Sequence, residues 1–398
     1  MSAAPHPPGS GLTARIRVAV VDDSMVVRGL FSRWLAEVPE VEIVGIHRNG
    51  LEAVRQIGRS RPDIVILDIE MPEMDGLTAL PLLLEASPGS RVLVVSSMSI
   101  RGADVTLRCL MRGATDYLAK PSGVLESATS ADFRTELVAR VCALGARRTA
   151  ISAAVPLARQ ERFPGLCEPD EPFRDDRDST PPFARPARPA ITSTGEEISL
   201  RPLSAAPPSL MVIGASTGGP QAVVALLSAL RADIAHLPVV IAQHMPPTFT
   251  MLFADHLRRQ AGLDALEIGG GELLMPGKVH IVRGGQHLSL VARGARFKAC
   301  AVPELATTRW TPSIDLLFAS AAKAAGAGAL AALLTGMGDD GAGGARLIAD
   351  AGGSVLAQDE ASSVVWGMPG VAARAGSAAA VLDLPAMAGL MRRLLQKR

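Results

Sequence analysis

The sequence predicts an α/β protein with two doubly wound parallel-sheet domains, the second carrying an added antiparallel hairpin. Near-continuous runs of Val, Ile and Leu, typical of strands buried on both faces, alternate with amphipathic helical stretches. The alternation occurs in two blocks separated by a proline-rich segment, and 398 residues suffice for two or three domains. Aromatic residues are only 3% of the chain, so aliphatic side chains must form the cores, which favours helix-covered parallel sheets.

Composition excludes several classes of protein. Lys and Arg number 40 against 39 Asp and Glu, so the net charge of +1 gives no strong attraction to nucleic acid or to an anionic membrane. The four cysteines lie far apart without metal-ligand spacing, which favours a reducing cytoplasm. The N-terminus has no signal-peptide pattern. The uncharged stretch between Arg201 and Arg231 contains prolines and glycines that would break a spanning helix, so we expect no membrane insertion.

The first block is expected at residues 15–135, after a disordered tail of residues 1–14. Its alternating pattern predicts a doubly wound parallel sheet. The apolar runs that predict its strands are residues 16–23, 63–70 and 91–97, and the amphipathic runs that predict its helices include residues 25–38 and 50–60.

Polar side chains stand where these strands end. Asp22 and Asp23 follow one strand and Asp68 follows another, while Ser96 and Lys120 come at spacings that fit further strand–helix–strand units. Because ligands gather at this edge of a doubly wound sheet, we expect the five side chains to converge there. Three carboxylates make an oxygen-rich site suited to Mg²⁺, and a carboxylate beside that ion can accept a phosphoryl group. The serine hydroxyl and the lysine ammonium can then bind the phosphoryl oxygens.

The motifs VVDDS, LDIEMPEMDG, VVSS and YLAKP, in this order, resemble the receiver domain of two-component response regulators. The resemblance implies a flavodoxin-like fold in which Asp68 is phosphorylated by a histidine kinase and the three carboxylates hold Mg²⁺. It also implies that Ser96 and Lys120 detect the phosphate and that Tyr117 is the switching aromatic residue. Receivers control many outputs, so this block indicates how the protein is regulated and leaves its activity open.

Between residues 136 and 208 the alternation stops. From about residue 156 the segment is rich in proline, with scattered charges and no apolar period, which predicts an extended flexible linker. The alternation returns in a second block, residues 209–398, and Arg-Gly-Gly at 283–285 between two apolar runs predicts a hairpin turn. The runs that predict strands there are residues 209–216, 237–244, 278–282, 286–291 and 329–338.

The turn GASTGGP, residues 214–220, follows a predicted strand and opens a helix. Its Gly-x-Ser-x-Gly pattern allows a sharp turn that presents Ser216 at the sheet edge as a nucleophile. Pro220 suits the first helical position, and the helix N-terminus offers amides to a developing oxyanion. Glycine and serine are also common in ordinary turns, so the pattern alone allows a purely structural role.

A histidine and an aspartate stand at two other predicted strand ends of the second block. His244 ends PVVIAQH, and Asp339 and Asp340 follow LLTGMG, whereas Asp315 is expected on a helix. Ser216, His244 and Asp340 together suggest a hydrolytic triad in the chain order Ser, His, Asp. The usual α/β-hydrolase places its acid before its histidine, and no histidine follows Asp340. That fold is therefore not expected.

The segments GASTGGPQA, AQHMPP, PSID, LLTGMGDDGAGG and QDEASSVVWGMP occur in order behind the receiver pattern. They resemble the chemotaxis response-regulator methylesterases, the protein-glutamate methylesterase and protein-glutamine glutaminase family. The resemblance implies a Rossmann-like domain in which Ser216 is the nucleophile, His244 the base and Asp340 the orienting acid, with the amides of Thr217 and Met337 as oxyanion donors. The implied reaction, which needs no cofactor, demethylates glutamates and deamidates glutamines on cytoplasmic helices of chemoreceptors.

The resemblance further implies that the unphosphorylated receiver covers the active site and that phosphorylation at Asp68 loosens the contact. The long, proline-rich linker lowers the effective concentration of one domain at the other, which predicts weaker autoinhibition.

Two other functions fit parts of the sequence. A receiver-controlled esterase for other substrates would need an apolar acyl pocket, and the sequence has no aromatic-rich segment to build one. A non-enzymatic phospho-dependent adaptor would not need Ser216, His244 and Asp340 together. A DNA-binding output is not expected, because the sequence shows neither a recognition-helix pattern nor a basic bias.

Overall fold

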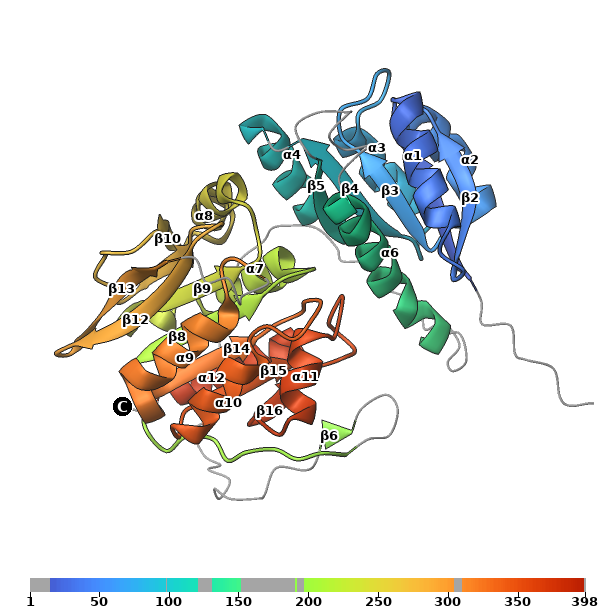
Figure 1. The fold of residues 1–398 in the computed structure, drawn as a ribbon. Helices are drawn as coiled ribbons and strands as arrows, with labels where there is room; N and C mark the ends of the chain where they lie inside the picture. Colours follow the sequence, from blue (N-terminus) through green and yellow to red (C-terminus); the bar gives the residue numbers. More distant parts are fainter. Residues whose placement is uncertain are drawn as a thin grey trace, which may run out of the picture.

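The computed structural model describes residues 15–97, 99–120, 131–151, 190–191, 197–303 and 310–396. These residues form two lobes, each with a parallel sheet and helices on both faces (Figure 1). The N-terminal lobe comprises the described residues up to 151, and the C-terminal lobe those from 197 onward. The expected tail at residues 1–14 and most of the expected linker lie outside the described residues.

The sheet of the N-terminal lobe has five parallel strands in the order β2-β1-β3-β4-β5. This is the flavodoxin-like order, and it confirms the expected fold class. Apolar side chains bury both faces of the sheet, as the continuous apolar runs predicted. The strands are β1 (Ile16–Val21), β2 (Val41–His47), β3 (Ile64–Asp68), β4 (Arg91–Ser97) and β5 (Asp116–Lys120).

The helices of the N-terminal lobe are α1 (Met25–Ala36), α2 (Gly50–Ser60), α3 (Gly76–Ala86), α4 (Ile100–Met111) and α6 (Ala131–Ile151). Each of the first four begins after a polar residue whose side chain accepts a hydrogen bond from a first-turn amide. These caps satisfy amides that have no partner within the helix, and thus specify where each helix starts. The capping residues are Ser24, Asn49, Asp75 and Ser99.

Helix α6 crosses residue 135, where the sequence pattern ended the first block. Its Phe133, Leu137, Val141 and Leu144 lie on one helical face and are buried in a core cluster of the N-terminal lobe. The ring of Phe133 packs 5.9 Å from that of Phe31 on α1. The folded part of the N-terminal lobe therefore continues into the segment expected to be linker.

The sheet of the C-terminal lobe has seven parallel strands in the order β10-β11-β9-β8-β14-β15-β16. From β8 the chain first builds the β9 side of the sheet and then returns to build the β14 side. The order therefore reverses between β8 and β14, and such a switch point is where open α/β sheets bind ligands. The strands are β8 (Leu210–Ala215), β9 (Val239–Gln243), β10 (Asp264–Ile268), β11 (Lys278–Val282), β14 (Ala329–Leu333), β15 (Ser354–Gln358) and β16 (Ala380–Leu382).

Helices cover both faces of this sheet. Apolar residues of α7 (Gly219–Leu230), α8 (Pro247–Ala261) and α12 (Leu384–Leu395) share one core cluster with one face. Those of α9 (Ile314–Ala325), α10 (Ala342–Asp350) and α11 (Met368–Arg374) share a second cluster with the other face. Successive strand residues alternate between these clusters, as side chains of a strand buried on both faces must.

The expected hairpin is present, but the turn at residues 283–285 was wrongly assigned to it. Strand β11 belongs to the large sheet, and the hairpin consists of β12 (His287–Arg293) and β13 (Arg296–Val302), joined through Gly294 at φ +60°. Residues 283–285 instead lead the chain off the sheet, where a Cβ on Gly284 would lie 2.2 Å from the carbonyl oxygen of Met245. The alternating, partly polar β13 carries a weaker strand signal than its neighbours.

The two short strands β6 (Ala190–Ile191) and β7 (Glu197–Ile198) pair antiparallel within the expected linker. Ile198 is buried with Ala357 and Ala373 of the C-terminal lobe. The chain therefore joins the C-terminal lobe before residue 209.

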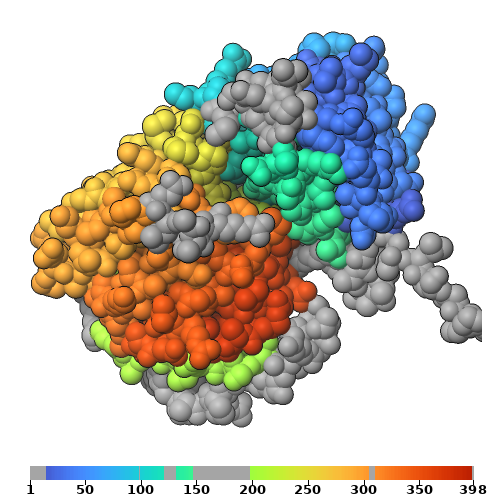
Figure 2. All heavy atoms as spheres, in the orientation of Figure 1, coloured from blue at the N-terminus to red at the C-terminus, as the bar shows by residue number. Residues whose placement is uncertain are grey.

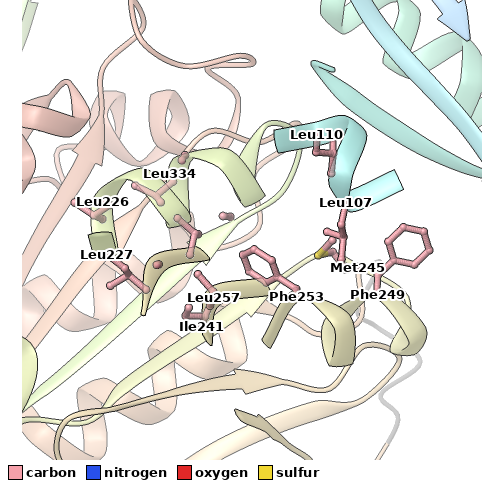
Figure 3. Close-up of a cluster of buried hydrophobic side chains, with 14 of the residues drawn as sticks. Leu107, Leu110, Leu226, Leu227, Ile241, Met245, Phe249, Phe253, Leu257 and Leu334 are labelled. Atoms are coloured by element: carbon pink, nitrogen blue, oxygen red, sulfur yellow. The ribbon is translucent and has the colours of Figure 1, made fainter. Parts of the chain in front are cut away.

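The lobes pack directly against each other (Figure 2). Figure 3 shows Leu107 and Leu110 of α4 beside Met245 and Phe249 of the C-terminal lobe, all within one continuous buried cluster. The side chain of Gln221 on α7 donates hydrogen bonds to the carbonyls of Leu110 (3.3 Å) and Ala114 (2.7 Å). The interface therefore combines apolar burial with polar contacts to the end of α4.

Within the described residues, no helix combines the length and the apolar character that crossing a bilayer requires.

Replacing Leu137 by Ala tests whether α6 belongs to the core of the N-terminal lobe. Because Leu137 is fully buried, we expect Leu137→Ala to lower the free energy of unfolding by about 2–4 kcal/mol in a urea titration. Thr135→Ala, at an exposed position on the same helix, is the control. Equal stability of the two variants would mean that the helix does not contribute to the core.

Candidate functional site

The three residues of the expected triad follow three neighbouring strands of the C-terminal lobe. Ser216 follows β8, His244 follows β9, and Asp340 lies in the loop between β14 and α10. Strands β9, β8 and β14 are adjacent in the sheet, and all three residues stand at its carboxyl edge. This edge contains the switch point between β8 and β14, which agrees with the expected location of a ligand site.

The turn that carries Ser216 is held by several hydrogen bonds. The amide of Ser216 donates to the carbonyl of Thr335 (3.1 Å), and its carbonyl accepts from the side chain of Gln243 (2.9 Å). Gly218 adopts φ +74° at the start of α7, a conformation that favours glycine. A Cβ on Gly336 would lie 2.8 Å from the Cβ of Ser216. Glycine at these two positions therefore permits the sharp turn and its close approach to the β14 loop.

His244 and Asp340 form a buried pair. The imidazole Nε2 lies 2.9 Å from Asp340 Oδ2, and the side chains are only 7% and 8% exposed. A carboxylate accepts hydrogen bonds only, so the Nε2 atom carries the proton in the neutral ring. The Nδ1 atom is buried and has no hydrogen-bond partner among the described residues. Its free lone pair makes Nδ1 the basic atom of the pair.

The N-terminus of α9 holds the carboxylate of Asp340. The amides of Ile314 (2.8 Å) and Asp315 (2.9 Å) donate to its two oxygens, and the hydroxyl of Ser313 donates to Oδ1 (3.3 Å). Burial opposes ionisation, but the hydrogen bond and charge of His244 together with these amides outweigh it and lower the pKa of Asp340. The carboxylate therefore stays charged and fixed beside the imidazole.

The backbone amides of Thr217 and Met337 follow β8 and β14 on the two sides of the switch point. Neither amide donates a hydrogen bond to any group within the described part of the chain. Both stand next to glycines with positive φ, Gly218 and Gly338. They are therefore available to an oxyanion formed near Ser216, which is the role expected for them.

Three contacts of this site were not anticipated from the sequence. Trp310 stacks on the ring of His244, Ser313 caps α9, and the amide of Ser313 donates to His287 Nδ1 (3.2 Å). The PSID segment contained a signal for the cap, since Ser before an apolar run is typical of a helix start. Asp315 lies on α9 as expected. Nothing in the local pattern around Trp310 indicated its contact with an imidazole about 66 residues distant in the chain.

The carboxylates of the N-terminal lobe also meet as expected. One oxygen of each of Asp22, Asp23 and Asp68 lies within 4.8 Å of the others at the ends of β1 and β3. Such a set of hard oxygen ligands fits Mg²⁺. The ammonium of Lys120 at the end of β5 donates to Asp22 (2.9 Å) and to Asp68 (2.8 Å). Four of the expected phosphorylation-site residues therefore share one edge of the sheet.

Burial raises the pKa of Asp68 to about 6. The nearby charge of Lys120 favours the ionised form but only partly offsets this effect, while the charge of Asp22 opposes ionisation further. A second positive charge near Asp68 would relieve this penalty, so the electrostatics also fit a cation-binding carboxylate.

The two remaining receiver residues are both buried but contact different parts of the protein. Ser96 is buried at the end of β4 and donates to the carbonyl of Gly102 (3.2 Å). Tyr117 points toward the other lobe, where its ring stacks on Phe249 of α8 with centroids 4.7 Å apart. The guanidinium of Arg140, which pairs with Asp116, lies 5.9 Å from the centre of the tyrosine ring. The expected switching residue is therefore itself an interface residue.

Comparisons with known proteins agree with both parts of this arrangement. Residues 18–128 match the response regulator receiver domain, and residues 211–391 match the CheB methylesterase. The chain is 42% identical over 384 residues to the protein-glutamate methylesterase/protein-glutamine glutaminase of group 2 operon of Bradyrhizobium diazoefficiens, covering 95% of this chain and 94% of that protein. It is 41% identical to a protein-glutamate methylesterase/protein-glutamine glutaminase of Nitrobacter hamburgensis, covering 98% and 97%.

Among solved structures, the CheB methylesterase catalytic domain of Thermotoga maritima is 33% identical. The match covers 48% of the present chain and 100% of the Thermotoga maritima domain, with a TM-score of 0.45.

The raised pKa of Asp68 makes stability depend on pH in a defined direction. The folded state favours the protonated carboxyl of Asp68. Its stabilising contribution is therefore complete at pH values below 3.8, the ordinary pKa of the group, and is lost as the pH rises through about 6. Asn has no charge to bury. With a chelator present to remove metal ions, we expect the free energy of unfolding of Asp68→Asn to exceed that of the parent by about 1–3 kcal/mol at pH 7.5. This difference is expected to shrink toward pH 4.5.

Urea unfolding at the two pH values measures this difference, and Asp23→Asn at an exposed position is the matched control. A pH-independent loss of stability in Asp68→Asn would contradict the assignment, because it would show that the ion pair with Lys120 outweighs the burial of the carboxylate.

Proposed function

Because this chain belongs to the protein-glutamate methylesterase/protein-glutamine glutaminase family, we propose that it hydrolyses glutamate γ-methyl esters and deamidates specific glutamines on cytoplasmic helices of chemoreceptors. The observation that carries the proposal is the convergence of Ser216, His244 and Asp340 on the switch point of the C-terminal sheet, with His244 and Asp340 hydrogen-bonded. The protein then acts in the cytoplasm, where it resets receptor signalling in chemotaxis and takes phosphoryl groups from a histidine kinase.

The first half of the reaction forms an ester on Ser216. His244 Nδ1 takes the hydroxyl proton as the serine oxygen attacks the γ-carbonyl carbon of the methylated glutamate. Asp340 keeps the Nε2–H in place and stabilises the imidazolium that results. The amides of Thr217 and Met337 receive the oxyanion, and one such donor is typically worth on the order of 10²–10³ in rate.

The first half ends when the imidazolium gives its proton to the methoxy oxygen and methanol leaves, so that a glutamyl ester remains on Ser216. The second half restores the enzyme. His244 Nδ1 then deprotonates a water that attacks this ester, and the serine oxygen leaves with the proton as free glutamate forms. With glutamine the same steps release ammonia in place of methanol. Because the proton always moves through Nδ1, the fixed orientation of the imidazole serves both halves.

Control of this chemistry is proposed to pass through the interface between the lobes. Helix α7 begins three residues after Ser216 and α8 three residues after His244, and both helices pack against the N-terminal lobe. The two clearest specific contacts are Gln221 with the end of α4 and Phe249 with Tyr117. In the unphosphorylated protein, the N-terminal lobe therefore sits beside the catalytic turns, where it obstructs the approach of a large receptor.

Phosphorylation of Asp68 changes the contacts of its neighbours. The carboxylates of Asp22, Asp23 and Asp68 would hold Mg²⁺, which would supply positive charge for phosphoryl transfer. The phosphoryl group adds about −1.5 to −2 charges at the Asp68 side chain, and Lys120 and Ser96 are placed to bind its oxygens. Withdrawal of Ser96 from the start of α4 shifts that helix and the adjacent Tyr117 away from α8. The interface then loosens and the active site opens to the receptor.

Methanol release from radiomethylated receptor membranes tests the proposed chemistry. We expect the parent protein to release methanol, faster with a phosphodonor and Mg²⁺, and Ser216→Ala to lose at least about 10³-fold of that rate, because the nucleophile is absent. Ser320→Ala on α9, remote from the sheet edge, is the matched control. A folded parent protein that releases no methanol would favour an adaptor or an esterase for other substrates.

Weakening the ring stack between the lobes tests the proposed control. An aromatic pair contributes about 0.5–1.5 kcal/mol beyond its buried area, so Phe249→Leu is expected to raise basal methanol release without phosphodonor by a few-fold to about tenfold. Phe253→Leu is the matched control, since Phe253 is equally buried on α8 and takes part in no ring stack among the described residues. Unchanged basal release with intact phosphodonor stimulation would contradict a role for this stack in inhibition.

A further inference from the structure

We propose that Trp310 is a positioning residue for the catalytic imidazole, an assignment that rests on the proposed function. Its indole ring lies almost parallel to the ring of His244, with centroids 5.3 Å apart and planes inclined by 14°. The same indole lies beside the β14 loop, where its Nε1 atom is 3.8 Å from the position that a Cβ on Gly338 would take. Trp310 therefore packs on the base and lies beside the loop that carries Met337 and Asp340.

The imidazole needs a second restraint besides the hydrogen bond to Asp340. Rotation of a histidine ring about its Cβ–Cγ bond has broad, shallow preferences, and one hydrogen bond at Nε2 restrains that rotation incompletely. A flat ring packed against one face limits rotation about this bond. The stack on Trp310 therefore defines the direction in which Nδ1 points, and Nδ1 is the atom that must meet the serine proton.

A single short segment restrains both members of the buried pair. Trp310 packs on His244, and three residues later Ser313 begins the helix whose first amides bind Asp340. The amide of Ser313 is in turn held by His287 on β12. The base and its partner acid are thus located by the same stretch of chain, so a displacement of this stretch would move both together.

The stack also favours the transition state over the ground state. The face of an indole carries negative charge density, so it attracts a cationic ring more strongly than a neutral one. His244 becomes cationic only after it has taken the serine proton. An interaction that strengthens at this point raises kcat and leaves substrate binding nearly unchanged.

A role in substrate binding predicts a different result. Trp310 is partly exposed and borders a cavity of about 550 Å³, together with Ser313, Asp339 and Leu347. If this indole served mainly to hold the receptor, its loss would raise KM and spare kcat. Whether the loss of Trp310 changes kcat or KM therefore distinguishes a positioning role from a binding role.

Kinetics of methanol release from methylated receptor membranes make the first test. We expect Trp310→Ala to lower kcat about 10- to 100-fold with KM changed less than about threefold, since small misplacements of a reacting group have effects of this size. Trp310→Phe keeps a flat ring and is expected to recover most of the loss. Leu347→Ala, half-exposed on the same cavity, is the control with unchanged constants. An unchanged kcat in Trp310→Ala, or a loss confined to KM, would overturn the proposal.

Indole fluorescence makes a second test that does not depend on turnover. Contact with an imidazole perturbs the emission of an indole, so His244→Gln is expected to change the emission spectrum of the parent protein and to leave that of Trp310→Phe unchanged. No change in the parent, or an equal change in the Trp310→Phe background, would overturn the stack. Failure of the parent to release methanol would instead contradict the proposed function, and the fluorescence comparison would still decide whether Trp310 contacts the imidazole.

Discussion

The catalytic arrangement depends on the hydrogen bonds that the N-terminus of α9 donates to the carboxylate of Asp340. A buried charge is costly unless hydrogen bonds replace its water, and here two backbone amides and a serine hydroxyl do so. Because the amides belong to the first turn of a helix, the helix dipole adds to the stabilisation. The charged, immobile acid then selects the Nε2–H form of His244, and this leaves Nδ1 free to act as the base. One local helix start thus selects the tautomer of a histidine that follows a different strand.

The sequence predicted the parts of this site that follow from sheet topology. Parallel strands bring their carboxyl ends to one edge, so Ser216, His244 and Asp340 could be placed together from the apolar runs that precede them. It could not predict the stack of Trp310 on His244, which depends on how the loop before α9 returns to the sheet. For the same reason the hairpin was assigned to the wrong turn. Short local patterns do not determine which strand a segment pairs with.

The interface between the lobes follows from the same topology. Each catalytic turn ends in the first residue of a helix, so whatever contacts the start of α7 or α8 lies near the active site. The buried cluster that joins the lobes includes apolar residues from α4, α7 and α8 (Figure 3). Tyr117 and Phe249, whose rings stack, also belong to it. Burial raises the pKa of Tyr117 far above its usual range, which keeps the phenol neutral at this boundary. The link between regulation and catalysis therefore uses packing more than charge.

The two lobes place a buried carboxylate at the same edge of a parallel sheet and give it opposite properties. Asp340 receives hydrogen bonds from amides and an imidazole, and its pKa is lowered. Asp68 shares one ammonium with a second aspartate, and burial raises its pKa to about 6. Groups of the protein alone compensate the charge of the Asp340 carboxylate, so it stays ionised and in one position. The Asp68 carboxylate has too little positive charge around it, and a bound metal ion would supply the charge that is missing. Incomplete compensation of a buried charge is therefore the physical basis on which one lobe can respond to a signal while the other stays ready for catalysis.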